Sequence, residues 1–130
     1  MKRKYLDKAG ATYRPDKIRP KHLRTRIRHW IQRRTYGFDD RETWDMDKTF
    51  YLWLYEHLMM FNDVTITDLE KSKLYTYREE EYTVAALIDI LLASLQIAIT
   101  KDYDLCTPAE REHIDDIPKI WAIIIREMWW

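Results

Sequence analysis

The stretch that decides the fold reads EEYTVAALIDILLASLQIAIT and spans residues 80–100. Apolar side chains recur along it in steps of three and four on two sides, through Val84, Ile88, Leu91, Leu95 and Ala98 and through Ala86, Ile90, Ala93 and Ile97. A helix with two apolar seams is typical of the centre of a helical bundle. A membrane span is disfavoured, because Asp89 near the middle would cost about 2.5–3.5 kcal/mol in a bilayer. We therefore expect no membrane partner.

Helical patterns on both sides of this stretch predict its packing partners. Before it, Asp39 or Asp40 is placed to cap a helix that runs to about Phe61. After it, Thr107-Pro108-Ala109-Glu110 predicts a helix start, since Thr caps, Pro suits the first turn and Glu completes a capping box. Pro118 should break that region, and the restarted helix should turn a row of apolar residues inward: Ile117, Ile120, Trp121, Ile124 and Met128.

A further helix is predicted upstream, over residues 20–35. Pro20 suits its first turn and Gly37 suits its C-terminal cap, and its apolar positions form one narrow stripe, at Leu23, Ile27, Trp30 and Ile31. Residues 64–78 are interpreted as an irregular connector, with a small hairpin as the second choice. The terminal pair Trp129-Trp130 should pack on the bundle or on a second subunit, because each ring has a large apolar area.

These patterns predict an all-α fold, a small bundle of about four helices with a basic N-terminal extension. A hydrophobic content of 46% is enough for a packed core. The first residues lack apolar periodicity. We therefore divide the chain into a flexible basic arm over residues 1–19 and a helical domain over residues 20–130.

Composition excludes several classes of functional site. The two glycines, Gly10 and Gly37, cannot form a Gly-rich phosphate loop. A single cysteine, Cys106, allows neither a disulfide framework within the chain nor a thiolate zinc site. One Glu-x-x-His motif, from Glu110 to His113, falls short of the two that a di-iron bundle needs. We therefore expect no catalytic residue, no metal and no cofactor, which is the pattern of a protein that is not an enzyme.

The formal net charge is zero, but the charges are unevenly distributed along the chain. Residues 1–34 carry thirteen Lys or Arg and two Asp, a net charge of +11, and the other 96 residues carry −11. Lys and Arg neutralise phosphates, and aromatic rings stack on bases. The sequence therefore predicts phosphate binding at Arg19, Lys21, Arg24, Arg26, Arg28, Arg33 and Arg34, with aromatic contacts at Trp30, Tyr36 and Trp44. The alternatives for this basic helix are a solvated face, or docking on the acidic body or on another subunit.

Two acidic residues are predicted to be buried polar groups. Asp89 lies on the apolar helix, and Asp47 shares a helix face with Trp44. A buried carboxylate needs a hydrogen-bond partner or a raised pKa. Asp47 also belongs to an acidic cluster with Asp39, Asp40, Glu42 and Asp45. Helix capping is the favoured interpretation of that cluster, and a divalent cation held by its oxygens is the alternative.

Residues 36–47 read YGFDDRETWDMD and resemble a signature of a group of small tailed-phage proteins, Tyr-Gly-Phe/Tyr-x-Asp-x-x-x-Trp-x-x-Asp. The resemblance continues at Glu79-Glu80-Glu81, at Ile88-Asp89-Ile90-Leu91 and at Met128-Trp129-Trp130, so it spans about residues 33–130. The basic arm departs from the group. The resemblance implies a phage or prophage origin, no known catalytic residue, and host takeover or counter-defence by binding.

The leading hypothesis is therefore a non-enzymatic phage-encoded binding protein that acts in the host cytoplasm. Its partner would be a phosphate-bearing ligand, either nucleic acid or a nucleotide, or a host defence protein. Two alternatives are an inhibitor whose acidic surface mimics nucleic acid and a structural or assembly homo-oligomer of the virion. The expected location in the host cytoplasm follows from two observations. No apolar stretch follows the basic start at Met1, as an export signal would require, and a lone cysteine suits a reducing compartment.

Overall fold

The chain forms six α-helices and one small hairpin in a computed structural model that describes residues 3–64 and 73–127. The elements are α1 (Lys4–Ala9), α2 (Leu23–Tyr36), α3 (Met46–Val64), β1 (Tyr75–Tyr77), β2 (Glu80–Tyr82), α4 (Val84–Thr100), α5 (Pro108–Asp115) and α6 (Ile117–Ile124), with short 3₁₀ helices η1 (Pro15–Lys17), η2 (Asp40–Thr43), η3 (Tyr103–Leu105) and η4 (Ile125–Glu127). The predicted all-α class is confirmed. None of the described helices has both the length and the apolar character required to cross a bilayer.

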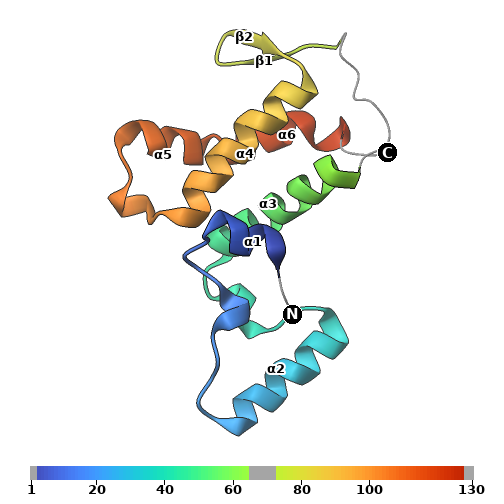
Figure 1. Cartoon of the computed structure of the whole chain (residues 1–130), viewed down its shortest axis with the longest axis vertical. Helices are drawn as coiled ribbons and strands as arrows, with labels where there is room; N and C mark the ends of the chain where they lie inside the picture. Colours follow the sequence, from blue (N-terminus) through green and yellow to red (C-terminus); the bar gives the residue numbers. More distant parts are fainter. Residues whose placement is uncertain (1–2, 65–72, 128–130) are drawn as a thin grey trace.

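Helix α4 is the centre of the bundle and packs against α3, α5 and α6 (Figure 1). The first predicted seam is buried along its whole length, at Val84, Ile88, Leu91, Leu95 and Ala98. The second seam is only partly buried, and Ala93 and Asp89 are exposed. The expectation that Asp89 is buried is wrong, because α4 is covered on one broad side rather than all round. Asp47 is also exposed, in the first turn of α3, so neither carboxylate needs a partner in the core.

The predicted helix boundaries after residue 100 are confirmed by their caps. The Thr107 hydroxyl accepts a hydrogen bond from the Glu110 backbone N–H, and the Glu110 carboxylate accepts one from Thr107, which completes the capping box of α5. Pro118 lies in the first turn of α6, where a missing N–H removes no helical hydrogen bond. The inward row is fully buried at Ile117, Ile120 and Ile124, whereas Met128 and the Trp129-Trp130 pair lie outside the described residues.

The segment before α4 forms a hairpin over residues 75–82, so only its first strand lies in the region 64–78 for which a hairpin was the second choice, and its second strand occupies residues expected to begin the helix. Tyr75 pairs with Tyr82 and Tyr77 with Glu80 in an antiparallel register. The two turn residues, Arg78 and Glu79, have φ of 49° and 66°. Positive φ at both turn positions is the geometry whose twist matches that of the flanking strands. Residues 65–72, the rest of the predicted connector, lie outside the described residues.

The N-terminal segment is folded against the bundle, so the prediction of a flexible arm is wrong for residues 3–19. Helix α1 packs on α3, and the Leu6 side chain is 0% exposed in the hydrophobic core. Hydrogen bonds to α4 hold the chain where it leaves α1. The Thr12 N–H donates to the Ile99 carbonyl (2.9 Å), and Gln96 Nε2 donates to the Ala9 carbonyl (2.9 Å). Leu6 is the fully buried residue of this segment, Tyr5, Ala9, Ala11 and Tyr13 pack on the core around it, and these few positions are too short a series for a periodic pattern.

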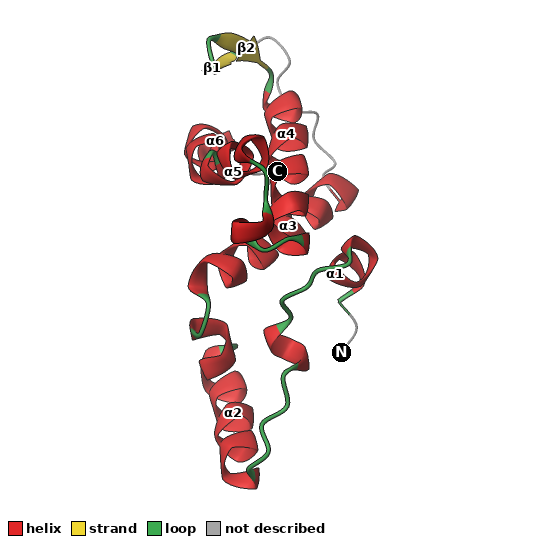
Figure 2. Cartoon of the chain, turned by 90° about the vertical axis from the view of Figure 1, so that its left-hand side faces the viewer, coloured by secondary structure: helices red, strands yellow, loops and turns green. Residues whose placement is uncertain are grey.

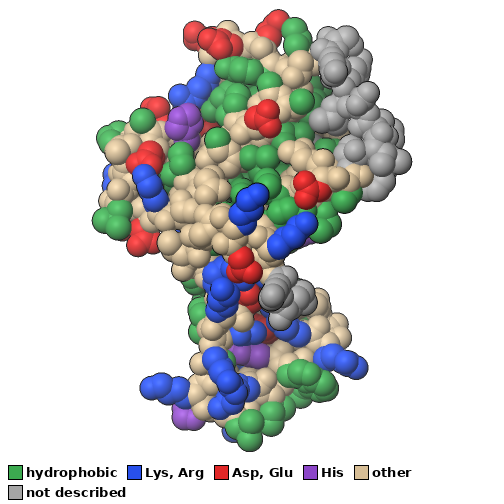
Figure 3. Space-filling view, in the orientation of Figure 1, with side chains coloured by type: hydrophobic (Ala, Val, Ile, Leu, Met, Phe, Trp, Pro, Cys, Tyr) green, Lys and Arg blue, Asp and Glu red, His purple; other side chains and the backbone are tan. Residues whose placement is uncertain are grey.

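Helix α2 lies apart from the bundle formed by α3 to α6, at the far end of an elongated molecule (Figure 2). Its C-terminus matches prediction: Gly37 has a φ of 85°, and its N–H donates to the Arg33 carbonyl. Its apolar stripe is exposed at Leu23, Ile27, Trp30 and Ile31. Lys and Arg side chains gather over this end and over the waist that joins it to the bundle (Figure 3).

Candidate anion-binding site

The candidate site lies where α2 faces the segment that leads from α1. Arg26, His29 and Arg33 are spaced at i, i+3 and i+7, so they share one face of α2. That face lines a cavity of about 420 Å³, which we call the basic cavity. Its charged lining consists of five cations and one carboxylate, which are Lys17, Arg19, Arg26, Arg33, Arg41 and Asp16.

His29 is the most unusual residue of the basic cavity. Its side chain is 4% exposed, and neither ring nitrogen has a hydrogen-bond partner among the described residues. The Nε of Arg26 is likewise buried without a partner in the described part of the chain. A buried polar group that finds no partner costs about 1–3 kcal/mol, and most such groups are paired. His29 and Arg26 both line the cavity, so its wall contains buried polar groups whose hydrogen bonds are not made within the described part of the chain.

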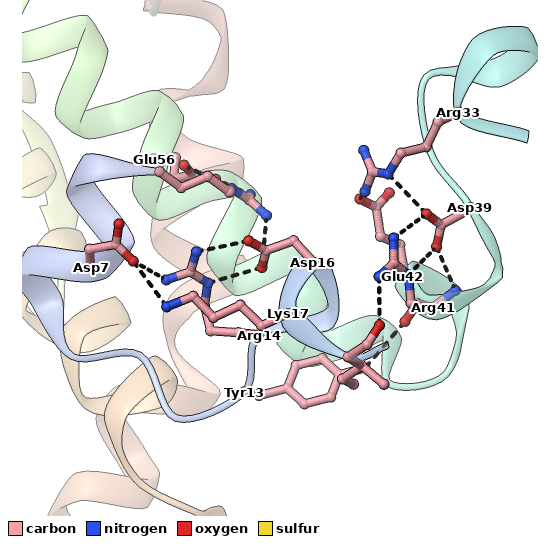
Figure 4. A network of polar contacts seen from close by, with 12 residues as sticks. Asp7, Tyr13, Arg14, Asp16, Lys17, Arg33, Asp39, Arg41, Glu42 and Glu56 are labelled. Carbon is pink, nitrogen blue, oxygen red and sulfur yellow. Dashed lines mark hydrogen bonds and ion pairs between the residues drawn. The ribbon is translucent and has the colours of Figure 1, made fainter. Parts of the chain in front are cut away.

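A buried carboxylate holds two of the cavity's arginines in place. Asp39 is 1% exposed and accepts hydrogen bonds from Arg33 Nε (2.9 Å) and from Arg41 Nε (2.9 Å) and Nη2 (2.8 Å), as well as from the Arg41 backbone (Figure 4). Desolvation raises the pKa of Asp39, but the bonds from Arg41 and the charge of Arg33 outweigh it and lower that pKa to about 2. Arg33 and Arg41 thus form a fixed wall.

The opposite side of the cavity is formed by residues 16–20, which a second ion-pair network holds. Arg14 is buried and donates to both oxygens of Asp16 (3.0 and 2.8 Å) and to Asp7 (2.6 Å). Arg41 Nη1 then donates to the Ile18 carbonyl (2.6 Å), which ties this segment to the Arg33–Arg41 wall. Desolvation raises the pKa of Asp16, yet its bonds to Arg14 lower it overall, so this carboxylate stays charged.

A second cavity adjoins the first at the same wall. It measures about 620 Å³, and we call it the aromatic cavity because Tyr36, Phe38 and Trp53 line it. Asp16, Arg33 and Arg41 line both cavities. The three aromatic rings are well exposed, at 67% for Tyr36, 48% for Phe38 and 44% for Trp53. The site thus places cationic and aromatic surfaces next to each other.

The structure brings only some of the predicted phosphate-binding residues together. Arg19, Arg26 and Arg33 line the basic cavity, and Lys21, Arg24, Arg28 and Arg34 do not. Arg28 instead pairs with Asp40 (3.0 Å), and the Arg34 guanidinium lies over the Trp30 ring, 5.4 Å from its centroid. Of the predicted aromatic contacts, Trp30 lines the basic cavity and Tyr36 the aromatic cavity. Trp44 meets His29 edge to face, with centroids 6.2 Å apart.

Three members of the acidic cluster, Asp39, Asp40 and Glu42, bind side chains of α2. Asp39 caps η2, and Arg33 and Gln32 of α2 reach Glu42 (2.8 Å) and Asp40 (2.7 Å) respectively. Among the described residues, no three His, Cys, Asp or Glu side chains are grouped so that they could hold a metal ion. Because Asp39 is buried, it is also not part of an acidic surface that could mimic nucleic acid.

Sequence reasoning missed His29, Lys17, Arg41, Phe38 and Trp53 as site residues. The spacing of Arg26, His29 and Arg33 on one helix face was visible in the sequence, but it does not show that residues 16–20 lie across from them. No protein-family model, no curated protein and no solved structure matches this chain. The resemblance to tailed-phage proteins therefore stays a prediction.

Proposed function

We propose that this chain is a non-enzymatic binding protein that holds a phosphate-bearing ligand, a nucleotide or nucleic acid, in the basic cavity. The observation that carries the proposal is His29, a buried imidazole that lines this cavity beside five cations and whose two ring nitrogens have no hydrogen-bond partner among the described residues. An imidazole N–H and guanidinium N–H groups are strong donors to phosphate oxygens.

The presence of arginines without a carboxylate partner supports the proposal that the cavity binds a phosphate. Within the described residues, Arg19 and Arg26 form no ion pair with a carboxylate, whereas Arg33 and Arg41 share Asp39. The two unpaired arginines therefore supply attraction for an anion, and the two paired ones supply fixed donors. Preorganised donors of this kind lose little conformational entropy when a ligand binds.

A charge-matched pair of variants tests the proposal. We expect Arg26→Gln to weaken binding of adenosine 5′-monophosphate about tenfold at low salt, because one charged hydrogen bond is worth about 1.5–3 kcal/mol. Arg24→Gln removes the same charge from an exposed position of the same helix, outside the cavity, and should change the affinity less than threefold. Isothermal titration calorimetry measures both.

Two results would overturn the proposal. Equal losses of affinity in the two variants would mean that α2 attracts anions through its overall charge and not through a specific site in the cavity. Absence of binding to the unaltered protein at low salt would exclude phosphate capture altogether, since electrostatic binding is strongest there.

We further propose, on the resemblance to tailed-phage proteins, that this binding serves host takeover or counter-defence in the host cytoplasm. Affinity pull-down from infected cells at low and high salt tests this setting. The expected result is recovery of a phosphate-bearing ligand that is released by salt. A virion protein recovered at both salt concentrations would favour an assembly role instead.

A further inference from the structure

The aromatic cavity contains a rigid aromatic platform. Trp53 of α3 stacks on the His57 ring, with centroids 4.2 Å apart and an interplanar angle of 28°, and on Phe50, at 6.3 Å and 17°. The His57 ring is itself fixed by a hydrogen bond of 2.7 Å between its Nδ1 and the Trp53 carbonyl. Although it is held on two sides, Trp53 remains 44% exposed. The exposed part of the ring is therefore held in a fixed position, where it can contact another flat group.

The groups around this platform match a nucleobase. Phe38 and Tyr36 add two more rings, 6.1 Å apart and tilted by 37°. Arg3 lines the same cavity and is held there by the Glu56 carboxylate and by Asp16 (3.6 Å). Aromatic rings and arginine guanidiniums are the surfaces on which bases stack in proteins that bind single strands.

The two cavities have a common wall, which places base and phosphate sites side by side. Arg33 and Arg41 line both, so a ligand that contacts them from one side meets His29, and from the other meets Trp53. Each cavity, at about 420 and 620 Å³, is within the size range of small-ligand sites.

We propose that the aromatic cavity receives the nucleobase of a ligand whose phosphate lies in the basic cavity. The ligand is then a nucleotide unit with an unpaired base, either free or within a single strand. A duplex does not fit, because its bases stay stacked and paired inside the helix. This inference rests on the proposed function and adds the recognition of a base to the recognition of a phosphate.

The experiment compares ligands that differ only in the base. Calorimetry at low salt is run with ribose 5-phosphate, adenosine 5′-monophosphate, and a 5′-phosphorylated oligoadenylate as single strand and as duplex. We expect adenosine 5′-monophosphate to bind at least fivefold more tightly than ribose 5-phosphate, because stacking is worth about 1–3 kcal/mol per base. Tighter binding of the single strand than of the mononucleotide would identify a strand, and the reverse a free nucleotide.

Variants of Trp53 assign the difference to the aromatic cavity. Trp53→Leu should reduce the affinity for adenosine 5′-monophosphate to that for ribose 5-phosphate and leave the latter unchanged, which also shows that the variant is folded. Trp53→Phe, which keeps an aromatic face, should retain most of the difference in affinity between adenosine 5′-monophosphate and ribose 5-phosphate.

Four outcomes contradict the inference. If ribose 5-phosphate binds as tightly as the nucleotide, or if Trp53→Leu weakens both equally, base recognition fails while the proposed function stands. If the duplex binds as tightly as the single strand, the ligand has no unpaired base in the cavity. If none of the phosphates binds, the proposed function itself fails and base recognition fails with it.

Discussion

At the scale of single residues, the site combines arginines that are paired with a carboxylate and polar groups that have no partner among the described residues. Asp39 fixes Arg33 and Arg41 from inside, so these side chains cannot rotate freely to follow a ligand. His29 and Arg26 bring buried nitrogens to the same cavity with no partner among the described residues.

Asp39→Asn tests the role of the buried carboxylate. We expect the free energy of unfolding to fall by about 3 kcal/mol, because two guanidiniums lose the charge that compensates them. The matched control is Asp102→Asn, since Asp102 is 72% exposed and lies 3.8 Å from Lys48, and it should change stability by less than about 0.5 kcal/mol. Urea unfolding monitored by circular dichroism measures both, and equal stabilities would show that the ion pairs at Asp39 contribute nothing.

The same carboxylate predicts how stability depends on pH. Folding lowers the pKa of Asp39 from 3.8 to about 2. A lowered pKa stabilises the fold fully above pH 4, and this stabilisation, about 2 kcal/mol, is lost as the pH falls from 4 to 2. We expect the difference in unfolding free energy between the unaltered protein and Asp39→Asn to shrink over that interval. A difference that stays constant down to pH 2 would contradict this account.

At the scale of elements, apolar periodicity predicted the positions of the helices more accurately than it predicted which of their faces are buried. The stripe of α2 has the spacing of a buried face, yet α2 lies apart from the bundle and Leu23 is 66% exposed. Conversely, α1 is too short for a periodic pattern, and its Leu6 side chain is fully buried. Periodicity reports local geometry, whereas burial depends on contacts between segments distant in the sequence.

Leu6→Ala tests whether the N-terminal segment is part of the folded domain. We expect a loss of about 3 kcal/mol in unfolding free energy, the usual cost of a cavity left by a buried leucine. Leu105→Ala is the control, because Leu105 is 80% exposed and should change stability by less than about 0.5 kcal/mol. If Leu6→Ala behaved like the control, residues 3–19 would be an arm that is not needed for folding.

At the scale of the whole molecule, the sequence predicted the all-α class and the central position of residues 84–100, because both follow from apolar periodicity in one segment. It also predicted the uneven distribution of charge. Docking of the basic helix on the acidic body was one of its alternatives, and Arg28 and Arg33 do pair with carboxylates of residues 39–42. It did not predict that Arg3, Arg14 and Lys17 pair with carboxylates of the same chain. Ion pairs between residues brought together by folding leave no local pattern, so the net charge of +11 overstates the charge available to a partner.

The candidate site was predictable only in part for the same reason. The sequence named the basic helix, and three of its seven predicted phosphate ligands, Arg19, Arg26 and Arg33, line the cavity. The other charged groups of that lining, Asp16, Lys17 and Arg41, come from η1 and η2. Which arginine faces a cavity and which faces solvent depends on how these segments meet, and that information appears only in three dimensions.

The most direct test of the central claim follows the ring resonances of the four histidines by NMR during titration with adenosine 5′-monophosphate at low salt. His29 is buried and lines the basic cavity, whereas His22 and His113 are exposed and line neither cavity, so they serve as internal controls. We predict a saturable shift at His29, larger than at His22 and His113, with the same affinity that calorimetry gives. Saturable binding that leaves the His29 resonances unmoved would contradict the account.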